Sequence, residues 1–184
     1  MNFIPRLIGL GLLSLLVFLV ISCDTARRTT NEFGSPNPIE GEVIAKPESR
    51  QIVRFTDSTA EYTTSRSELA TAFIREFGDG TVVDKIQVRK APARTGEPVK
   101  YYLIGMGLRS GSFRAMALPL VSGGDNTYYL RPSAESYIIT SAGCTSCFFN
   151  FENSRIVSTS CSENSPGSHC DLKVVPANTL FTKR

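Results

Sequence analysis

The chain has no tryptophan, a single histidine and no run of basic residues longer than a pair. Its 20 lysine and arginine residues are nearly balanced by 17 aspartate and glutamate residues, which gives a formal net charge of +3. A surface that binds nucleic acid needs a concentrated patch of basic residues, and this sequence has none. We therefore expect no nucleic-acid partner.

Combinations of residues that are typical of enzymes are also missing. The lone histidine, His169, lies in a polar stretch between two cysteines, where we expect a solvated side chain and no catalytic base. Asp79, Asp84 and Glu97 have no spacing that suggests paired acid–base chemistry, and there is no Gly-x-Ser-x-Gly motif. The sequence therefore favours a protein that is not an enzyme, and it predicts no cofactor.

One glycine-containing stretch resembles a phosphate-binding loop. Gly105 and Gly107 precede Ser110 and Gly111, but the third glycine of the motif is absent and no helix is expected to follow. We interpret Gly105 and Gly107 as positions at which a strand is flattened or lets a neighbouring element approach closely.

The chain has one long apolar run, and this run is short for a transmembrane helix. Leu7–Ile21 is interrupted only by glycines and Ser14, and Arg6 is the only charged side chain before it. The run covers about 15 residues, whereas a helix needs about 20 to cross the hydrocarbon layer. A basic start, a short apolar core and a small residue at its end are the parts of a secretory signal peptide, which we predict at residues 1–22.

The four residues that end this run resemble the lipobox of bacterial lipoproteins. Val20-Ile21-Ser22-Cys23 stands where the apolar run stops and polar sequence begins. The resemblance implies cleavage before Cys23, acylation of its sulfur and its new amine, and stable attachment to a bacterial membrane by two or more acyl chains. The alternative is an uncleaved membrane anchor that happens to end in cysteine. Asp24 signals inner-membrane retention in some bacteria only, so it does not identify the membrane.

The mature chain divides into a polar tether and one domain. Residues 23–50 contain several prolines and glycines and few large apolar side chains, so they cannot bury enough surface to offset the entropy of ordering. Residues 51–184 are enough for a single domain with its own core. We expect the tether to join the acylated end to this domain in the cell envelope, on the periplasmic or outer-membrane side.

One segment of the domain has helical periodicity. Within residues 65–77, apolar side chains recur at i, i+3, i+4 and i+8 starting from Leu69, which puts them on one helical face. Ser65 and Glu68 have the spacing of a capping box, and Gly78 supplies a stop. We therefore predict an amphipathic helix over these residues.

Most of the remaining domain alternates between apolar and polar residues, as β-strands do. The predicted strands are Gln51–Thr56, Thr81–Arg89, Lys100–Leu108, Phe113–Val121, Thr127–Arg131, Tyr137–Thr140, Cys147–Phe151, Arg155–Cys161 and Cys170–Val175. The predicted fold is α+β, with one amphipathic helix packed on an antiparallel meander sheet whose other face can be exposed to water. A cysteine-rich C-terminal β segment at residues 141–184 completes it.

Four cysteines follow the lipobox, and all lie in the last quarter of the chain. They are Cys144, Cys147, Cys161 and Cys170, with the spacing Cys-x2-Cys-x13-Cys-x8-Cys. An even number in an exported domain favours two disulfides, and the choice among the three possible connectivities stays open. One alternative is a metal or iron–sulfur site with four thiolate ligands, in which His169 could replace Cys170. Another is a thiol–disulfide redox site at Cys144 and Cys147.

Four tyrosines are the remaining candidates for a binding surface. Tyr101, Tyr102, Tyr128 and Tyr129 could form an aromatic patch, although cross-strand packing explains them as well. We expect a lipid-anchored, non-enzymatic binding or structural module of the bacterial envelope, which contacts an unidentified protein or small molecule through its sheet face or tail loop. The alternative is a metal-binding, iron–sulfur or thiol-redox protein that works through its four C-terminal cysteines.

Overall fold

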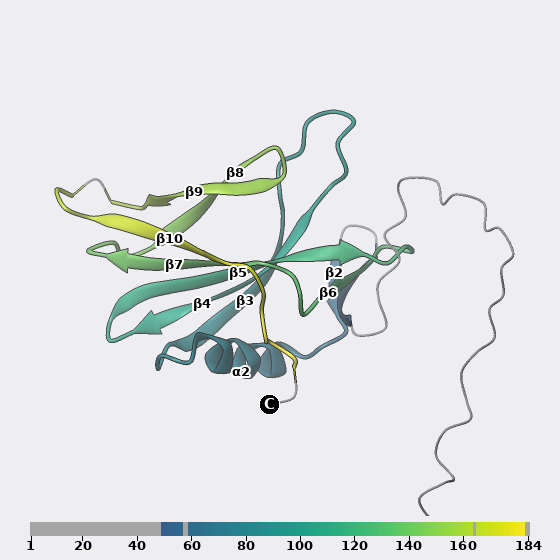
Figure 1. Ribbon diagram of the computed structural model, residues 1–184, viewed down its shortest axis with the longest axis horizontal. Helices are drawn as coiled ribbons and strands as arrows, with labels where there is room; N and C mark the ends of the chain where they lie inside the picture. The colour runs from purple at the N-terminus through teal and green to yellow at the C-terminus, as the bar shows by residue number, and fades with distance from the viewer. Residues whose placement is uncertain (1–48, 57–58, 164, 183–184) are drawn as a thin grey trace, which may run out of the picture. The chain divides into compact units, whose positions relative to one another are not determined.

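The computed structural model describes residues 49–56, 59–163 and 165–182 (Figure 1). The predicted signal peptide, the acylated Cys23 and nearly all of the tether lie outside the described residues. The elements are β1 (Arg50–Thr56), β2 (Thr59–Tyr62), α2 (Arg66–Phe77), β3 (Val82–Lys90), β4 (Tyr101–Arg109), β5 (Ser112–Ser122), β6 (Thr127–Leu130), β7 (Ser136–Ala142), β8 (Cys147–Glu152), β9 (Arg155–Cys161) and β10 (His169–Val175).

The helix α2 forms where the sequence predicts it. Ser65 caps its first turn by accepting a hydrogen bond from the Glu68 amide at 3.2 Å. Gly78 follows the helix in the left-handed conformation, with a φ of 61°, and so ends it. Leu69 and Phe73 are fully buried on one face, which confirms the predicted amphipathic pattern.

Eight strands form one antiparallel sheet, in which β5 has three neighbours. β3, β4 and β5 follow one another along the chain and pair in that order. On its other edge, β5 pairs with β7 through Arg114–Ala117 and with β6 through Val121–Ser122. The sheet therefore branches: β6 leads to β1 and β2, and β7 leads to β10.

Within the described residues the fold is mostly β with one helix, and the expected meander order holds from β3 to β6, after which β7 pairs with β5 and not with β6. The order changes because β5 has 11 residues and offers two pairing segments on one edge, whereas β6 has only 4 residues. The sequence does not predict β2. All nine strands that it does predict are confirmed, with ends that shift by at most two residues.

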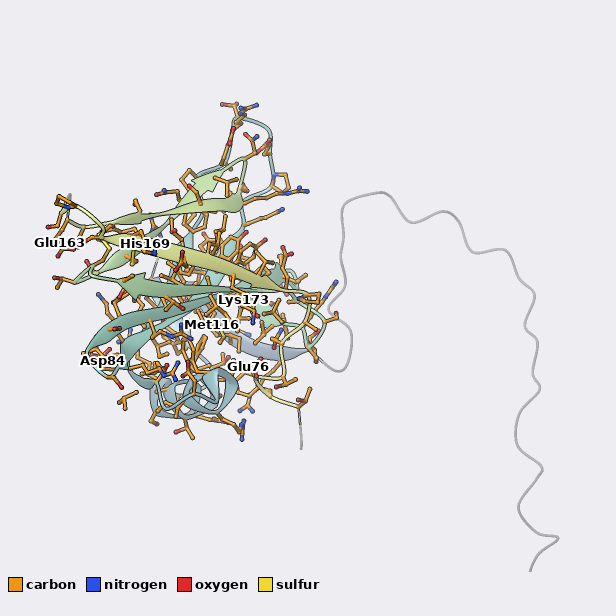
Figure 2. All side chains as sticks on the ribbon, turned by 60° about the vertical axis from the view of Figure 1, so that its left-hand side comes forward. Glu76, Asp84, Met116, Glu163, His169 and Lys173 are labelled. Carbon is orange, nitrogen blue, oxygen red and sulfur yellow. A yellow bond between two sulfur atoms is a disulfide. The ribbon has the colours of Figure 1, made fainter. Side chains whose placement is uncertain are left out.

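One face of the sheet packs on the helix. Leu69 and Phe73 of α2 belong to a buried cluster with Ile86 of β3, Leu103 of β4 and Met116 of β5. Met116 is 1% exposed and lies in the interior in Figure 2. This cluster is the hydrophobic core between the helix and the sheet.

The opposite face of the sheet is covered by the β8–β9 hairpin, so the expectation of a water-exposed face is wrong (Figure 1). Phe149 and Ile156 of the hairpin are buried against Tyr102 and Ile104 of β4 and Ala117 of β5. The reason is visible in β4, where apolar side chains occupy consecutive positions and not every second one. Such runs are typical of strands that are buried on both faces.

The chain after β10 returns to the helix (Figure 1). Leu180 is fully buried in the same cluster as α2. The Arg75 guanidinium donates to the Leu180 carbonyl oxygen at 3.0 Å, and the Glu76 carboxylate accepts from the Thr179 amide at 2.8 Å. The C-terminal segment is therefore part of the packed domain.

Candidate functional site

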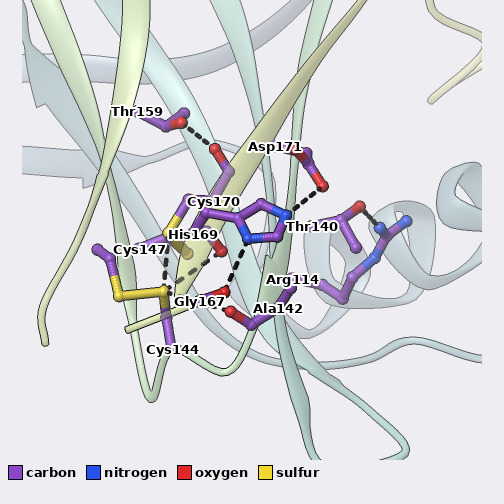
Figure 3. Close-up of polar contacts among 11 residues, drawn as sticks. Arg114, Thr140, Ala142, Cys144, Cys147, Thr159, Gly167, His169, Cys170 and Asp171 are labelled. Carbon is purple, nitrogen blue, oxygen red and sulfur yellow. Dashed lines mark hydrogen bonds and ion pairs between the residues drawn. A yellow bond between two sulfur atoms is a disulfide. The ribbon is translucent and has the colours of Figure 1, made fainter. Parts of the chain in front are cut away.

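The four downstream cysteines come together at one end of the hairpin. Cys144 precedes β8, Cys147 begins it, Cys161 ends β9 and Cys170 lies in β10. The structure joins Cys144 to Cys161 and Cys147 to Cys170, with Cα–Cα distances of 5.7 and 6.0 Å. The Sγ atoms of Cys144 and Cys170 are 3.5 Å apart, so the two bridges are in contact (Figure 3). We call these four residues the sulfur cluster.

The register of the hairpin brings more than one pairing within reach. Cys147 lies directly opposite Cys161 across β8 and β9, yet the two are not bonded to each other. The Cys147–Cys170 bridge ties β8 to the main sheet, and the Cys144–Cys161 bridge ties β9 to the loop before β8. Because a two-stranded hairpin is marginally stable by itself, these links hold it in place over the sheet.

The sulfur cluster also has part of the geometry of a metal site. The Sγ atoms of Cys144, Cys161 and Cys170 all lie within 4.8 Å of one another, a separation that one thiophilic ion could bridge in the reduced protein. His169 does not join them. Its side chain is 59% exposed, and its Nε2 lies 3.5 Å from the Asp171 carboxylate. The interpretation of His169 as a solvated side chain is confirmed.

The carboxylate of Glu163 borders the sulfur cluster. It accepts a hydrogen bond from the Thr145 amide at 2.9 Å. Hydrogen bonds from Thr145 and Ser162 hold the pKa of Glu163 below its usual value, so this group is ionised at neutral pH. A fixed negative charge next to Cys144 and Cys161 disfavours a thiolate there, which weakens the case for a reactive thiol.

A groove of about 810 Å³ opens beside the hairpin, between β8 and β3. Met106, Leu108, Phe113 and Phe148 give it an apolar lining. Leu108 and Phe148 are 48% and 49% exposed, so part of this lining is in contact with water. Three charged residues also line it: Asp84, Lys85 and Arg89. We call this feature the β8 groove.

A larger cleft of about 1170 Å³ lies on the other side of the hairpin and is lined from β9 by Arg155, Ile156 and Val157. Three exposed valines contribute to it, with exposed fractions of 41%, 52% and 49%: Val99, Val157 and Val174. We call this feature the Arg155 cleft. Together, the groove and the cleft contain five of the seven large hydrophobic side chains that are exposed in the described part of the chain.

The Arg155 cleft also contains polar groups. The Tyr137 hydroxyl donates a hydrogen bond to the Glu135 carboxylate. Burial, and then this hydrogen bond, raise the pKa of Tyr137, so its hydroxyl remains protonated at neutral pH. The buried Nε atom of Arg131 has no hydrogen-bond partner within the residues described. Apolar walls with a few polar groups are typical of ligand sites.

The predicted tyrosine patch is divided between the two faces of the sheet. On the helix side, Tyr101 and Tyr128 pack with Phe55, with ring centroids 4.6 and 5.5 Å from that of Phe55. Tyr102 faces the hairpin, where its hydroxyl donates to the Ser154 carbonyl oxygen at 3.1 Å. Tyr101, Tyr102 and Tyr128 therefore serve packing between strands and layers, which is the alternative interpretation, and the Tyr129 hydroxyl donates to the side-chain oxygen of Gln51 at 3.3 Å.

The two glycines of the apparent phosphate-binding motif both lie within β4, and the strand β5 follows them. A Cβ atom on Gly107 would lie 1.9 Å from the carbonyl oxygen of Val82, and one on Gly105 would lie 2.6 Å from Cγ of Phe73. The interpretation of these glycines as positions of close approach is confirmed.

The three acidic residues considered for acid–base chemistry lie in three different places. Asp84 lines the β8 groove, and Glu97 lies in the loop between β3 and β4. Asp79 forms ion pairs with Arg109 and Arg114 at 3.4 and 2.8 Å. This last network was not predicted, because residues 30 and 35 positions apart give no local signal.

No protein-family model, curated protein or solved structure matches this chain. No helix in the described part of the chain has the length and hydrophobicity that a membrane-spanning segment needs. The groove and the cleft were missed at the sequence level, although Phe148 gave a signal. It follows the inward-facing Cys147 and precedes the inward-facing Phe149, so alternation places a large apolar side chain on the outer face.

Proposed function

We propose that this protein is a lipid-anchored, non-enzymatic binding module of the bacterial cell envelope. The proposal depends on the position of Cys23, at the end of an apolar run too short to span a membrane and at the start of polar sequence. Acyl chains on Cys23 would hold the protein at a membrane on the periplasmic or outer-membrane side. The polar residues that follow would act as a tether for the domain.

Two properties of the domain support a binding role. Large hydrophobic side chains are exposed around the β8 groove and the Arg155 cleft, and clustered exposed apolar side chains mark sites of interaction. Charged groups in both hollows could orient a bound molecule. The sulfur cluster links the hairpin between them to the sheet, and disulfides suit the oxidising compartment that export implies.

Replacement of Cys23 tests the anchor. We expect the wild-type protein to sediment with envelope membranes, to carry acyl chains in its intact mass and to accumulate as a precursor in cells treated with globomycin. Cys23→Ser should abolish acylation and the cleavage before residue 23, because serine offers no sulfur for the first acyl chain, and the variant should keep its leader. Ser22→Ala, which keeps a small residue before the cysteine, is the matched control. A Cys23→Ser protein that is still processed and membrane-bound contradicts the proposal.

A second candidate function is metal binding or thiol chemistry at the sulfur cluster. The specific observation in its favour is the convergence of three Sγ atoms within 4.8 Å. Intact-mass analysis of protein purified from the envelope separates the two candidates. Two disulfides lower the mass by about 4 Da relative to the reduced chain, because each bond removes two hydrogen atoms. Four free thiols with stoichiometric zinc or iron would support the second candidate.

A further inference from the structure

The strand β8 has one paired edge and one unpaired edge. It pairs with β9, and no other strand of the described residues pairs with it. An unpaired edge offers backbone N–H and C=O groups to a further strand. The β8 groove is lined from this strand by Cys147 and Phe148, and from the loop before it by Ser146. The free edge and the apolar groove are therefore adjacent.

Alternation along β8 identifies its free backbone groups. The Ser162 amide donates to the Ser146 carbonyl oxygen at 3.0 Å, so these opposed residues form a hydrogen-bonded pair. In an antiparallel ladder, hydrogen-bonded and non-hydrogen-bonded pairs alternate. The backbone groups of Cys147 and Phe149 therefore point to the unpaired edge, whereas those of Phe148 point to β9.

The other side of the groove is less suited to the addition of a strand. β3 also pairs on one edge, with β4, but its register shifts between Val83 and Lys85, so that Asp84 interrupts the ladder. Bulges and charged side chains are the devices by which natural sheets protect an edge. From Cys147 to Phe151, β8 has no charged residue, and its own irregularity lies at the far end of this stretch.

The groove is closed at the far end of β8. The Ser154 amide donates to the Pro92 carbonyl oxygen at 3.1 Å, and the Arg89 guanidinium carbon lies 5.0 Å from the ring centroid of Phe151. Since Asp84 and Lys85 share the groove with the start of β8, the strands β3 and β8 run in the same direction on either side of it. A strand antiparallel to β8 would therefore be antiparallel to β3 as well.

We propose that an extended peptide segment of a partner protein binds to β8 as a third, antiparallel strand of the hairpin layer. This inference builds on the proposed binding function and names the class of partner. Alternate apolar side chains of the segment fill the groove next to Met106, Leu108 and Phe113. The long side chains of Lys85 and Arg89, which outnumber the one carboxylate in the groove lining, extend past the segment to pair with acidic side chains on its outer face.

The probe is a synthetic peptide of about seven alternating valine and glutamate residues, the length of a natural strand. The mature, acylated protein is reconstituted in phosphatidylcholine nanodiscs, and empty nanodiscs are the blank. The expected result is saturable binding with slowed amide exchange at Cys147 and Phe149 and unchanged exchange at Phe148. A peptide with lysine in place of glutamate should bind about tenfold more weakly, because its charge repels that of Lys85 and Arg89. Methylation of alternate peptide amides should weaken binding by a similar factor, because it removes ladder hydrogen bonds.

Two matched variants locate the site on the hairpin. Phe148→Ser and Val157→Ser each remove an exposed apolar side chain, with exposed fractions of 49% and 52%, so neither should unfold the domain. Phe148 lines the β8 groove and Val157 lines the Arg155 cleft. Phe148→Ser should weaken peptide binding about fivefold, as expected for a lost cross-strand contact, whereas Val157→Ser should leave it unchanged.

Three results would overturn the inference: no saturable binding, binding that ignores methylation of the peptide amides, or binding that depends on Val157 as strongly as on Phe148. Amide exchange that slows only at residues of the Arg155 cleft would also reject the β8 site. The anchoring part of the proposed function is tested separately, by the intact mass and the processing of Cys23→Ser. Failure of the peptide to bind a protein that is correctly acylated would therefore reject the peptide site and leave the anchor standing.

Discussion

The ring of Phe73 in α2 occupies the space above Gly105 in β4, so closely that a Cβ atom on residue 105 would lie 2.6 Å from Cγ of the ring. Phe73 is fully buried. The absence of a side chain at Gly105 thus lets the helix approach the sheet. The glycine that resembles part of a phosphate-binding motif is instead a packing position between the helix and the strand.

Gly105→Ala should therefore lower the free energy of unfolding by about 1–3 kcal/mol, because the added methyl group overpacks a buried contact. A double-mutant cycle with Phe73→Leu tests the cause. If the contact with the ring is responsible, Gly105→Ala should cost less in the Phe73→Leu background than in the wild type. Urea unfolding followed by circular dichroism measures all four proteins. Equal costs in both backgrounds would show that the ring is not the obstacle.

Regular local patterns explain how much of this fold could be predicted from the sequence. The period of apolar residues in α2 and the alternation in β5 are properties of single segments, and both elements form as expected. The continuous apolar run in β4 predicts a strand, and it also signals burial on both faces. That signal could have predicted the cover that the β8–β9 hairpin provides.

Features that depend on contacts between distant segments could not be predicted. The connectivity of Cys144 and Cys147 depends on the register of β8 with β9 and on the approach of β10, and neither follows from spacing. The β8 groove is formed by residues of β3, β4 and β8, which are separated by loops of unpredictable path. The role of Glu68 also depends on a distant segment. Its carboxylate pairs with Arg50 of β1 and does not complete the expected capping box.

Ser65→Ala tests the N-terminal cap of α2. The Ser65 hydroxyl accepts a hydrogen bond from the Glu68 amide, and alanine has no side-chain oxygen that could accept it. We expect the free energy of unfolding to fall by about 1 kcal/mol. Ser67→Ala, two residues later, is the matched control: its hydroxyl lies 3.2 Å from that of Ser65 but caps no backbone amide of the described residues, so its loss should change stability less. If the two substitutions cost the same in urea unfolding, the cap at Ser65 does not stabilise the helix.

Asp79→Asn should change how stability depends on pH. Burial alone raises the pKa of Asp79, but hydrogen bonds from Thr81 and the charges of Arg114 and Arg109 outweigh it and hold the pKa below its ordinary value of 3.8. A carboxyl group with a lowered pKa in the folded state stabilises the protein above the unfolded-state pKa, and this contribution is lost as the pH falls through the folded-state pKa.

The stability difference between wild type and Asp79→Asn should therefore be constant above about pH 5 and shrink as the pH falls below 4. Urea unfolding at a series of pH values measures it. Asp84→Asn removes one negative charge from the groove lining and controls for net charge. If the stability difference between wild type and Asp79→Asn grows on acidification, the pKa of Asp79 is raised in the folded state and the assigned direction is wrong.

Removal of matched cysteine pairs tests the connectivity of the sulfur cluster. Cys144→Ser with Cys161→Ser should leave a protein without free thiols, because Cys147 and Cys170 remain bonded to each other. The free energy of unfolding under non-reducing conditions should fall by about 2–4 kcal/mol, because the unfolded chain loses a bridge across a sequence separation of 17 residues. Electron-transfer dissociation of non-reduced peptides assigns the bonds in the wild type. Detection there of a bond between Cys147 and Cys161, which lie opposite each other in the hairpin, would contradict the connectivity and the hairpin anchoring that follows from it.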